Sequence, residues 1–150
     1  MKKIFFLFIS LLTTVFVFAQ PKDPVGWKYE CKKISDGVYD LIITATVPQP
    51  WHIYSQFTPK GGPVPTKITF KPNPLVVLDG KAKELGKLEK TNDQTFKVDV
   101  MFFSNSVQFV QTIKLKAKVK TSISGIVEYM VCNDQQCLPP VKKSFDIQLQ

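Results

Sequence analysis

Apolar and polar residues alternate one by one through most of this chain, and this period of two constrains the fold more than any other feature. Successive side chains of a β-strand point to opposite faces of a sheet, so the alternation predicts strands that are buried on one face. Beyond the first residues, no long stretch keeps the period of about 3.6 residues that an amphipathic helix requires. The alternation recurs in residues 27–31, 38–47, 67–70, 95–103, 107–119, 123–131 and 144–149. The sequence therefore predicts an all-β fold.

Turn-forming residues separate these segments at intervals typical of a sandwich of two sheets. Examples are Ser35-Asp36-Gly37, Pro48-Gln49-Pro50, Asp79-Gly80 and Ser104-Asn105. A chain of 150 residues has room for one domain, and several short strands within that length predict an immunoglobulin-like antiparallel β-sandwich. The stretch from Leu75 to Lys90 alternates least, and we expect it to be a long loop.

The first residues have the pattern of a secretory signal peptide. Met1-Lys2-Lys3 is a short cationic start, residues 4–18 are uncharged and mostly apolar, and Val17-Phe18-Ala19 has small residues where a signal peptidase reads. The apolar run is shorter than the roughly 20 residues that a membrane-spanning helix needs. We expect residues 1–19 to be removed from an exported domain of residues 20–150. A signal that is retained as an anchor is the alternative.

The charged residues exclude one class of partner. Lysine and arginine number 20 against 12 acidic residues, the formal net charge is +8, and every basic residue is lysine. Arginine, whose planar guanidinium reads phosphates and guanine edges with paired hydrogen bonds, is absent from the chain. We therefore expect no sequence-specific binding of nucleic acid. Lys114, Lys116, Lys118 and Lys120 alternate with apolar residues, which predicts one solvated face of a strand.

The cysteines carry the clearest chemical signal. The chain has three, and an exported chain with an odd number leaves at least one unpaired. Cys132 and Cys137 are separated by four polar residues directly after an apolar strand, so a hairpin there would bring them within disulfide distance. Cys31 shares a predicted strand face with Trp27 and Tyr29, and we expect it to act as a small buried hydrophobic residue.

The residues alone leave three interpretations of the cysteine pair open. A structural disulfide would hold the hairpin together, although so small a ring stabilises a fold less than a long-range bridge does. A redox-active pair needs one accessible thiolate and one partner sulfur close by, and a protruding loop meets both needs. A metal site is the third interpretation, with His52, the one histidine of the chain, as a further ligand.

The segment from Tyr129 to Pro140 resembles the active-site hairpin of a known family. In this segment a strand leads into two close cysteines that are followed by a Pro-Pro pair, as in the periplasmic N-terminal domain of DsbD, a bacterial transmembrane thiol:disulfide interchange protein. Residues 51–56 (WHIYSQ), 61–65 (GGPVP) and 84–87 (ELGK) agree with the family in order, so the resemblance spans essentially the whole mature chain. Stand-alone secreted versions, known as disulfide bond corrector proteins, are the most similar.

The resemblance implies an immunoglobulin-like domain that passes reducing equivalents through a Cys132/Cys137 redox pair, which is protein-disulfide reductase activity. Cys137 would attack and form mixed disulfides, Cys132 would resolve them, and neither a metal nor an organic cofactor would take part. The expected location is the periplasm. The expected partners are thioredoxin-like proteins, including those of cytochrome c maturation, with a membrane thiol carrier as electron donor and the domain itself a monomer.

Further residues take supporting roles by the same resemblance. His52 and Tyr54 fall where the family has tyrosines beside the cysteines, and His52 is suited to relay protons because its unperturbed pKa lies near neutrality. Glu84, Leu85 and Gly86 fall where the family has a cap loop that shields the disulfide.

Two other expectations stand beside these. Lys142 and Lys143 are close to Cys137 in sequence, and a nearby positive charge would favour its thiolate. The alternative function is a non-enzymatic exported binding module whose disulfide only pins a hairpin.

Overall fold

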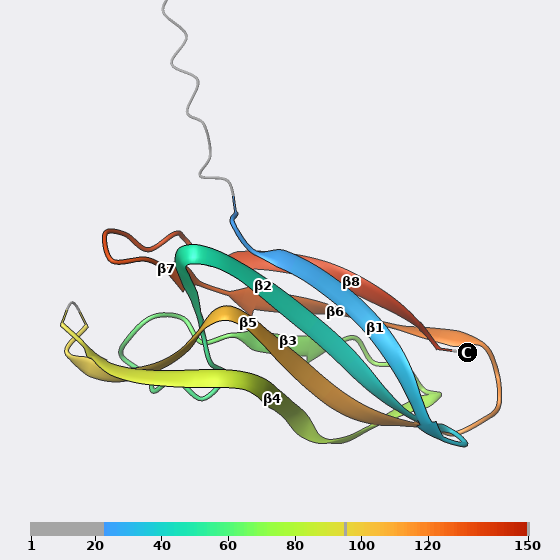
Figure 1. The fold of residues 1–150 in the computed structure, drawn as a ribbon. Coiled ribbons are helices and arrows are strands. Elements are labelled where there is room, and N and C mark those ends of the chain that lie inside the picture. Colours follow the sequence, from blue (N-terminus) through green and yellow to red (C-terminus); the bar gives the residue numbers. More distant parts are fainter. Residues whose placement is uncertain (1–22, 95, 150) are drawn as a thin grey trace, which may run out of the picture.

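The computed structural model describes residues 23–94 and 96–149, and within them eight strands form two antiparallel sheets (Figure 1). The strands are β1 Gly26–Ser35, β2 Val38–Tyr54, β3 Lys67–Phe70, β4 Val76–Asp93, β5 Val98–Leu115, β6 Thr121–Tyr129, β7 Val131–Cys132 and β8 Val141–Leu149. The larger sheet has the order β1-β2-β5-β4, with β7 added beside β2, and the smaller sheet has the order β3-β6-β8. The predicted all-β antiparallel sandwich is confirmed.

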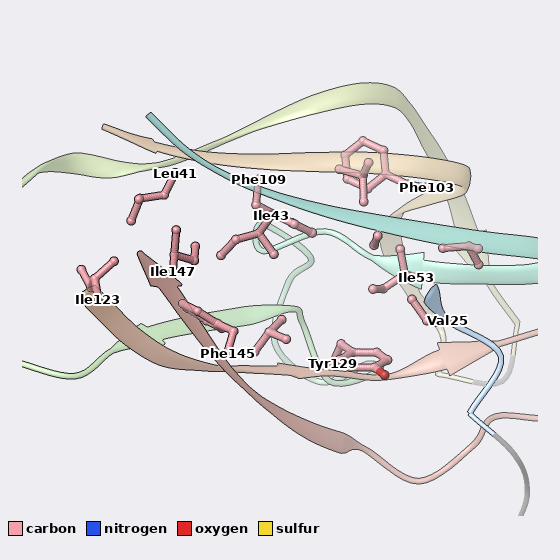
Figure 2. Packing of buried hydrophobic residues seen from close by; sticks show 14 of the residues in the cluster. Val25, Leu41, Ile43, Ile53, Phe103, Phe109, Ile123, Tyr129, Phe145 and Ile147 are labelled. Atoms are coloured by element: carbon pink, nitrogen blue, oxygen red, sulfur yellow. The ribbon is translucent and has the colours of Figure 1, made fainter. Parts of the chain in front are cut away.

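The main core lies between the two sheets, where the predicted alternation buries one face of each strand (Figure 2). Leu41 and Ile43 of β2 and Phe109 of β5 point from the larger sheet toward Phe145 and Ile147 of β8. The first three are 0 to 1% exposed. Full burial of each such side chain contributes about 1.5–3 kcal/mol to stability. Packing between the faces therefore holds the sandwich together.

The segment that we expected to be a long loop is a strand. Residues Val76–Asp93 form β4, which pairs with β5 at the edge of the larger sheet. Its alternation is hidden because the register shifts twice, between Asp79 and Lys83 and between Gly86 and Leu88. Many of its side chains are exposed and lysine recurs among them, as expected for an edge strand that must not pair with other chains.

Other turns and strand boundaries also differ from the sequence-based expectation, and the expected turn Asp79-Gly80 lies inside β4. The strand β2 runs through Pro48-Gln49-Pro50 to Tyr54, although its pairing with β5 is interrupted between Val47 and His52. Ser104-Asn105 lies inside β5, where Asn105 has a positive φ of 70°. The strand ends at Leu115, so residues 116–120 form a loop and not the predicted strand face.

Asp23 ties the start of the described chain to the smaller sheet. Its carboxylate accepts hydrogen bonds from the Tyr129 hydroxyl and the Val25 amide, and one oxygen lies 2.7 Å from Lys143 Nζ. Burial raises the pKa of Asp23, but the hydrogen bonds from Lys143 and Tyr129 outweigh burial and hold this pKa below its usual value.

The predicted signal peptide, residues 1–19, lies outside the described residues. Within the part of the chain that the structure describes, no helix is long and apolar enough to cross a membrane.

Gly125 provides a test of how the side chains and backbone of the smaller sheet pack around β6. A Cβ at this position would lie 2.6 Å from the Thr69 carbonyl oxygen and would overlap the ring of Phe145. We expect Gly125→Ala to lower the free energy of unfolding by about 1–3 kcal/mol, measured by urea titration, because overpacking forces the backbone apart. The control is Gly26→Ala, whose Cβ would meet nothing closer than 3.8 Å. Equal urea midpoints of unfolding for the two variants would contradict the close contact of Gly125 with Thr69 and Phe145.

Candidate functional site

A disulfide closes the hairpin that follows β6. It joins Cys132, the last residue of β7, to Cys137, with 4.0 Å between their Cα atoms. The Leu138 amide donates to the Val131 carbonyl at 2.9 Å, and the Asn133 amide donates to the Gln136 carbonyl at the same distance. The predicted pairing of these two cysteines is therefore present, in a hairpin whose backbone is closed on both sides of the sulfurs.

The loop between the cysteines is ordered by one side chain. Asn133 Oδ1 accepts hydrogen bonds from the amides of Gln135, at 2.9 Å, and Gln136, at 2.8 Å. Asparagine is common in such turns because its carbonyl replaces a backbone acceptor. Asp134, Gln135 and Gln136 are exposed, so the tip of the hairpin presents a short polar surface beside the disulfide.

The two cysteines differ sharply in exposure. Cys132 is 2% exposed and packs with Tyr54 and Val100 in a small apolar cluster separate from the main core. Cys137 is exposed. Of the two cysteines, Cys137 is therefore the one that a molecule approaching from solvent can contact, whereas Cys132 is buried.

His52 is the direct neighbour of Cys132. The two residues are opposite partners in the antiparallel pairing of β2 with β7, so their side chains lie on the same face of the sheet with their Cβ atoms roughly 4.5–5.5 Å apart. His52 Nε2 lies 3.1 Å from the Tyr54 hydroxyl oxygen, and its ring contacts Phe102 with 4.6 Å between ring centroids. Both predicted supporting residues, His52 and Tyr54, are thus beside the disulfide.

Burial sets the protonation of this pair. Removal from solvent lowers the pKa of His52, and the negative charges of Asp134, Asp93 and Glu89 oppose that effect only in part. Removal from solvent also raises the pKa of Tyr54 to about 12. Near neutral pH the imidazole is therefore uncharged and the tyrosine keeps its proton.

These side chains line a groove with a volume of about 770 Å³ at one end of the sandwich. One wall is the cysteine hairpin and the opposite wall is the turn between β4 and β5, and Figure 1 shows β7 and that turn at the same end of the molecule. The floor contains His52, Tyr54 and Phe102. Further lining residues are Gln49, Pro50, Thr91, Asn92, Asp93, Gln94, Phe96, Val100, Ser104 and residues 132–137.

The expected cap loop is not a loop and does not line this groove. Glu84, Leu85 and Gly86 belong to β4 and pair with β5. Glu84 accepts hydrogen bonds from Ser55 Oγ and from the Gln56 amide, both at 2.7 Å, and so fastens the segment after β2 to the edge strand. Leu85 is 54% exposed and does not line the groove.

The wall that sequence reasoning missed is the turn between β4 and β5. It brings Asn92, Asp93, Gln94 and Phe96 to the groove, and Asp93 Oδ1 accepts a hydrogen bond from the Phe96 amide at 3.1 Å. Phe96 is half-buried and is the aromatic residue that this turn contributes to the groove. The signal was present in the polar run before Phe96, which is typical of a turn.

Lys142 and Lys143 were predicted to lie near the Cys137 thiolate, but the structure pairs both with other groups. Lys142 Nζ lies 3.5 Å from a carboxylate oxygen of Glu128, and Lys143 Nζ lies 2.7 Å from Asp23. Neither lysine lines the groove.

The third cysteine lies apart from this site. Cys31 is unpaired and half-buried against the main core, on the same strand face as Trp27 and Tyr29, as expected. Burial raises the pKa of its thiol. In the described part of the chain, no group of three or more His, Cys, Asp and Glu side chains is arranged to hold a metal ion.

The position of Phe96 predicts which residue shields the disulfide. We expect Phe96→Ala to accelerate reduction of the oxidised protein by dithiothreitol severalfold, because removal of the ring opens one wall of the groove. Leu85→Ala is the matched control and should leave the rate unchanged. A mass-spectrometric thiol count measures the loss of the disulfide over time. If Leu85→Ala alone accelerates reduction, residues 84–86 shield the disulfide and Phe96 does not.

Comparison with known proteins identifies the family. The family model described as the N-terminal region of the thiol:disulfide interchange protein DsbD matches residues 21–149. A search of curated proteins finds no match.

Solved structures share the fold. The reduced DsbD N-terminal domain of Neisseria meningitidis is 17% identical, with a TM-score of 0.54 over 81% of this chain and 83% of that one. The same bacterium's DsbD N-terminal domain in a complex with the PilB N-terminal domain is 15% identical, with a TM-score of 0.52 over 80% of each chain. The N-terminal periplasmic domain of ScsB from Proteus mirabilis is 12% identical, with a TM-score of 0.55 over 85% of this chain and 46% of that one.

These likenesses confirm the predicted immunoglobulin-like sandwich. Because the family model covers the whole described domain, including both cysteines of the groove, this chain belongs to the family of the DsbD N-terminal domain.

Proposed function

We propose that this protein exchanges thiols and disulfides through Cys132 and Cys137 and passes reducing equivalents to partner proteins in the periplasm. The observation that carries the proposal is the unequal exposure of the two cysteines in one groove. Exchange through a mixed disulfide needs one sulfur that a partner can reach and a second that is protected until the first has reacted. Membership in the DsbD N-terminal family supports the same chemistry.

The reaction begins with both cysteines reduced. The Cys137 thiolate attacks one sulfur of the partner's disulfide, and the partner's other sulfur leaves as a thiolate and takes up a proton. Cys132 then loses its proton and attacks the Cys137 sulfur, which releases the partner's first sulfur. The partner gains two electrons and two protons, and the Cys132–Cys137 disulfide forms. A reducing partner acts by the reverse sequence.

His52 is the base for the second step in this proposal. Its lowered pKa leaves the imidazole uncharged near neutral pH, and its place opposite Cys132 puts it beside the thiol that must lose a proton. In the tautomer whose Nε2–H donates to the Tyr54 hydroxyl oxygen, Nδ1 keeps the lone pair that accepts this proton. Tyr54 thereby orients the ring.

The partners belong to the same proposal. Thioredoxin-like proteins are the expected acceptors, and a membrane thiol carrier is the expected electron donor. Two observations on relatives support this view: a DsbD N-terminal domain forms a complex with the PilB N-terminal domain, and the ScsB domain is described as periplasmic. A cleaved signal peptide of residues 1–19 would deliver this chain to the same compartment.

The reduction potential of the pair tests the function. We expect a value well above about −300 mV with the fold intact after reduction, because a disulfide that cycles must be open to reduction by cellular thiols. The measurement equilibrates the protein in dithiothreitol or glutathione buffers, counts free thiols by mass spectrometry and follows circular dichroism. A much lower potential, or unfolding on reduction, would favour the non-enzymatic binding module with a structural disulfide.

Cysteine variants test the two roles. Cys132→Ser should accumulate a mixed disulfide on Cys137 in periplasmic extract, because the sulfur that resolves it is gone. Cys137→Ser should trap little, because Cys132 is 2% exposed. Trapping by Cys137→Ser alone would reverse the assignment, and non-reducing gels with mass spectrometry distinguish the outcomes.

The role of His52 is tested by the pH dependence of resolution. The reduced protein is mixed with limiting 5,5′-dithiobis(2-nitrobenzoate), whose second released thiolate reports the attack by Cys132. We expect His52→Phe to slow this second phase by roughly tenfold or more near pH 7, since a general base is lost while the ring remains. The wild-type rate should level off above the lowered pKa of His52, whereas the variant rate should keep rising with pH as hydroxide removes the proton. Identical rates and profiles would exclude His52 as the base, and Tyr54→Phe should show a smaller effect in the same direction.

A further inference from the structure

We propose that the groove selects partners whose surface around the reactive disulfide is basic. The acidic residues on the rim of the groove, Asp93, Asp134 and Glu89, set this preference. The inference rests on the proposed function and specifies its substrate class. The chain has 20 lysines and a formal net charge of +8. The described residues that line the groove nevertheless include two aspartates and no lysine.

The acidic groups come from both walls. Asp134 is exposed on the cysteine hairpin, directly beside the disulfide, and Asp93 lies on the opposite wall at the end of β4. Glu89 is on the same face of β4, since it pairs with Phe102 of the groove floor. All three raise the pKa of His52, so their fields reach the residue opposite Cys132.

Four lysines near the groove in sequence do not line it. Lys90 is on the other face of β4, where it pairs with Met101 and lines a separate hollow beside Pro59. Lys97 is in the β4–β5 turn, where it is exposed and does not line the groove. Lys142 and Lys143 are paired with Glu128 and Asp23. The disulfide therefore lies in a groove whose described lining residues carry two carboxylates and no ammonium group, in a protein whose net charge is positive.

This arrangement affects both encounter and reaction. A negative potential at Cys137 disfavours its thiolate, which makes the free protein a poor nucleophile toward neutral or anionic disulfides. Positive charge on an approaching partner cancels that potential and also speeds the encounter. The rim thus favours exchange where a basic surface docks and slows it elsewhere.

Small charged disulfides test this preference without a protein partner. The reduced protein is mixed with cystamine, which is cationic, with bis(2-hydroxyethyl) disulfide, which is neutral, and with dithiodiglycolate, which is anionic. In each case Cys137 attacks the probe and one probe thiol leaves, then Cys132 displaces the second. Each rate is divided by the rate of dithiothreitol with the same probe, which removes differences between the leaving thiols.

We expect the normalised rate to fall from cystamine to the neutral probe to dithiodiglycolate, with roughly tenfold between the extremes at low salt. The spread should shrink at about 1 M salt, where the screening length is only about 3 Å. The double variant Asp93→Asn and Asp134→Asn should also reduce the difference in normalised rate between cystamine and dithiodiglycolate at low salt. Asparagine at position 93 keeps an oxygen that can accept the hydrogen bond from the Phe96 amide.

Asp36→Asn is the control, because it removes an acidic charge at the far end of the sandwich, in the β1–β2 turn (Figure 1). It should leave the spread unchanged. Equal normalised rates for the three probes, a reversed order, or the same loss of spread in Asp36→Asn would overturn the charge preference while exchange itself persists. Absence of exchange with every probe would instead refute the proposed function.

Discussion

The pairing of the two-residue strand β7 with β2 is the contact on which the rest of the site depends. It consists of two residue pairs, His52 with Cys132 and Ile53 with Val131, and these pairs face opposite sides of the sheet. Ile53 and Val131 are 0 and 1% exposed in the main core. A slip of one residue would turn Cys132 into that core and Val131 out of it, so hydrophobic burial fixes the register that puts the disulfide beside His52.

Two prolines precede this pairing in β2. Proline cannot donate a ladder hydrogen bond, and the pairing of β2 with β5 is interrupted in the stretch that holds Pro48 and Pro50. When pairing resumes at His52, β2 lies between β5 on one side and β7 on the other. Gln49 Nε2 donates to Asn105 Oδ1 at 3.1 Å across the interruption. The chain thus leaves the regular ladder where the groove begins, and Gln49 and Pro50 become part of its lining.

The sequence predicted the strands whose apolar and polar residues alternate regularly. It did not predict the features that depend on which strands become neighbours in the sheet. Alternation located the strands that face the core, and cysteine spacing located the hairpin, because both signals are contained in a few neighbouring residues. The edge strand β4 was missed since two register shifts and exposed lysines hide its period. The acidic wall around Asp93 was missed for a related reason: its meeting with Cys137 depends on which strands become neighbours, and spacing along the chain carries no such information.

The buried apolar residues of the described chain form two clusters, and the cluster that holds the two sheets together is not the one that contains Cys132. The main core spans both sheets and contains neither cysteine of the pair, whereas Cys132 packs with Tyr54 and Val100 in the small second cluster. Opening the disulfide therefore removes no side chain from the main core. The Leu138 amide donates to the Val131 carbonyl, and both residues belong to the main core. In the proposed exchange, these contacts would hold two free thiols close together, as a pair that alternates between dithiol and disulfide requires.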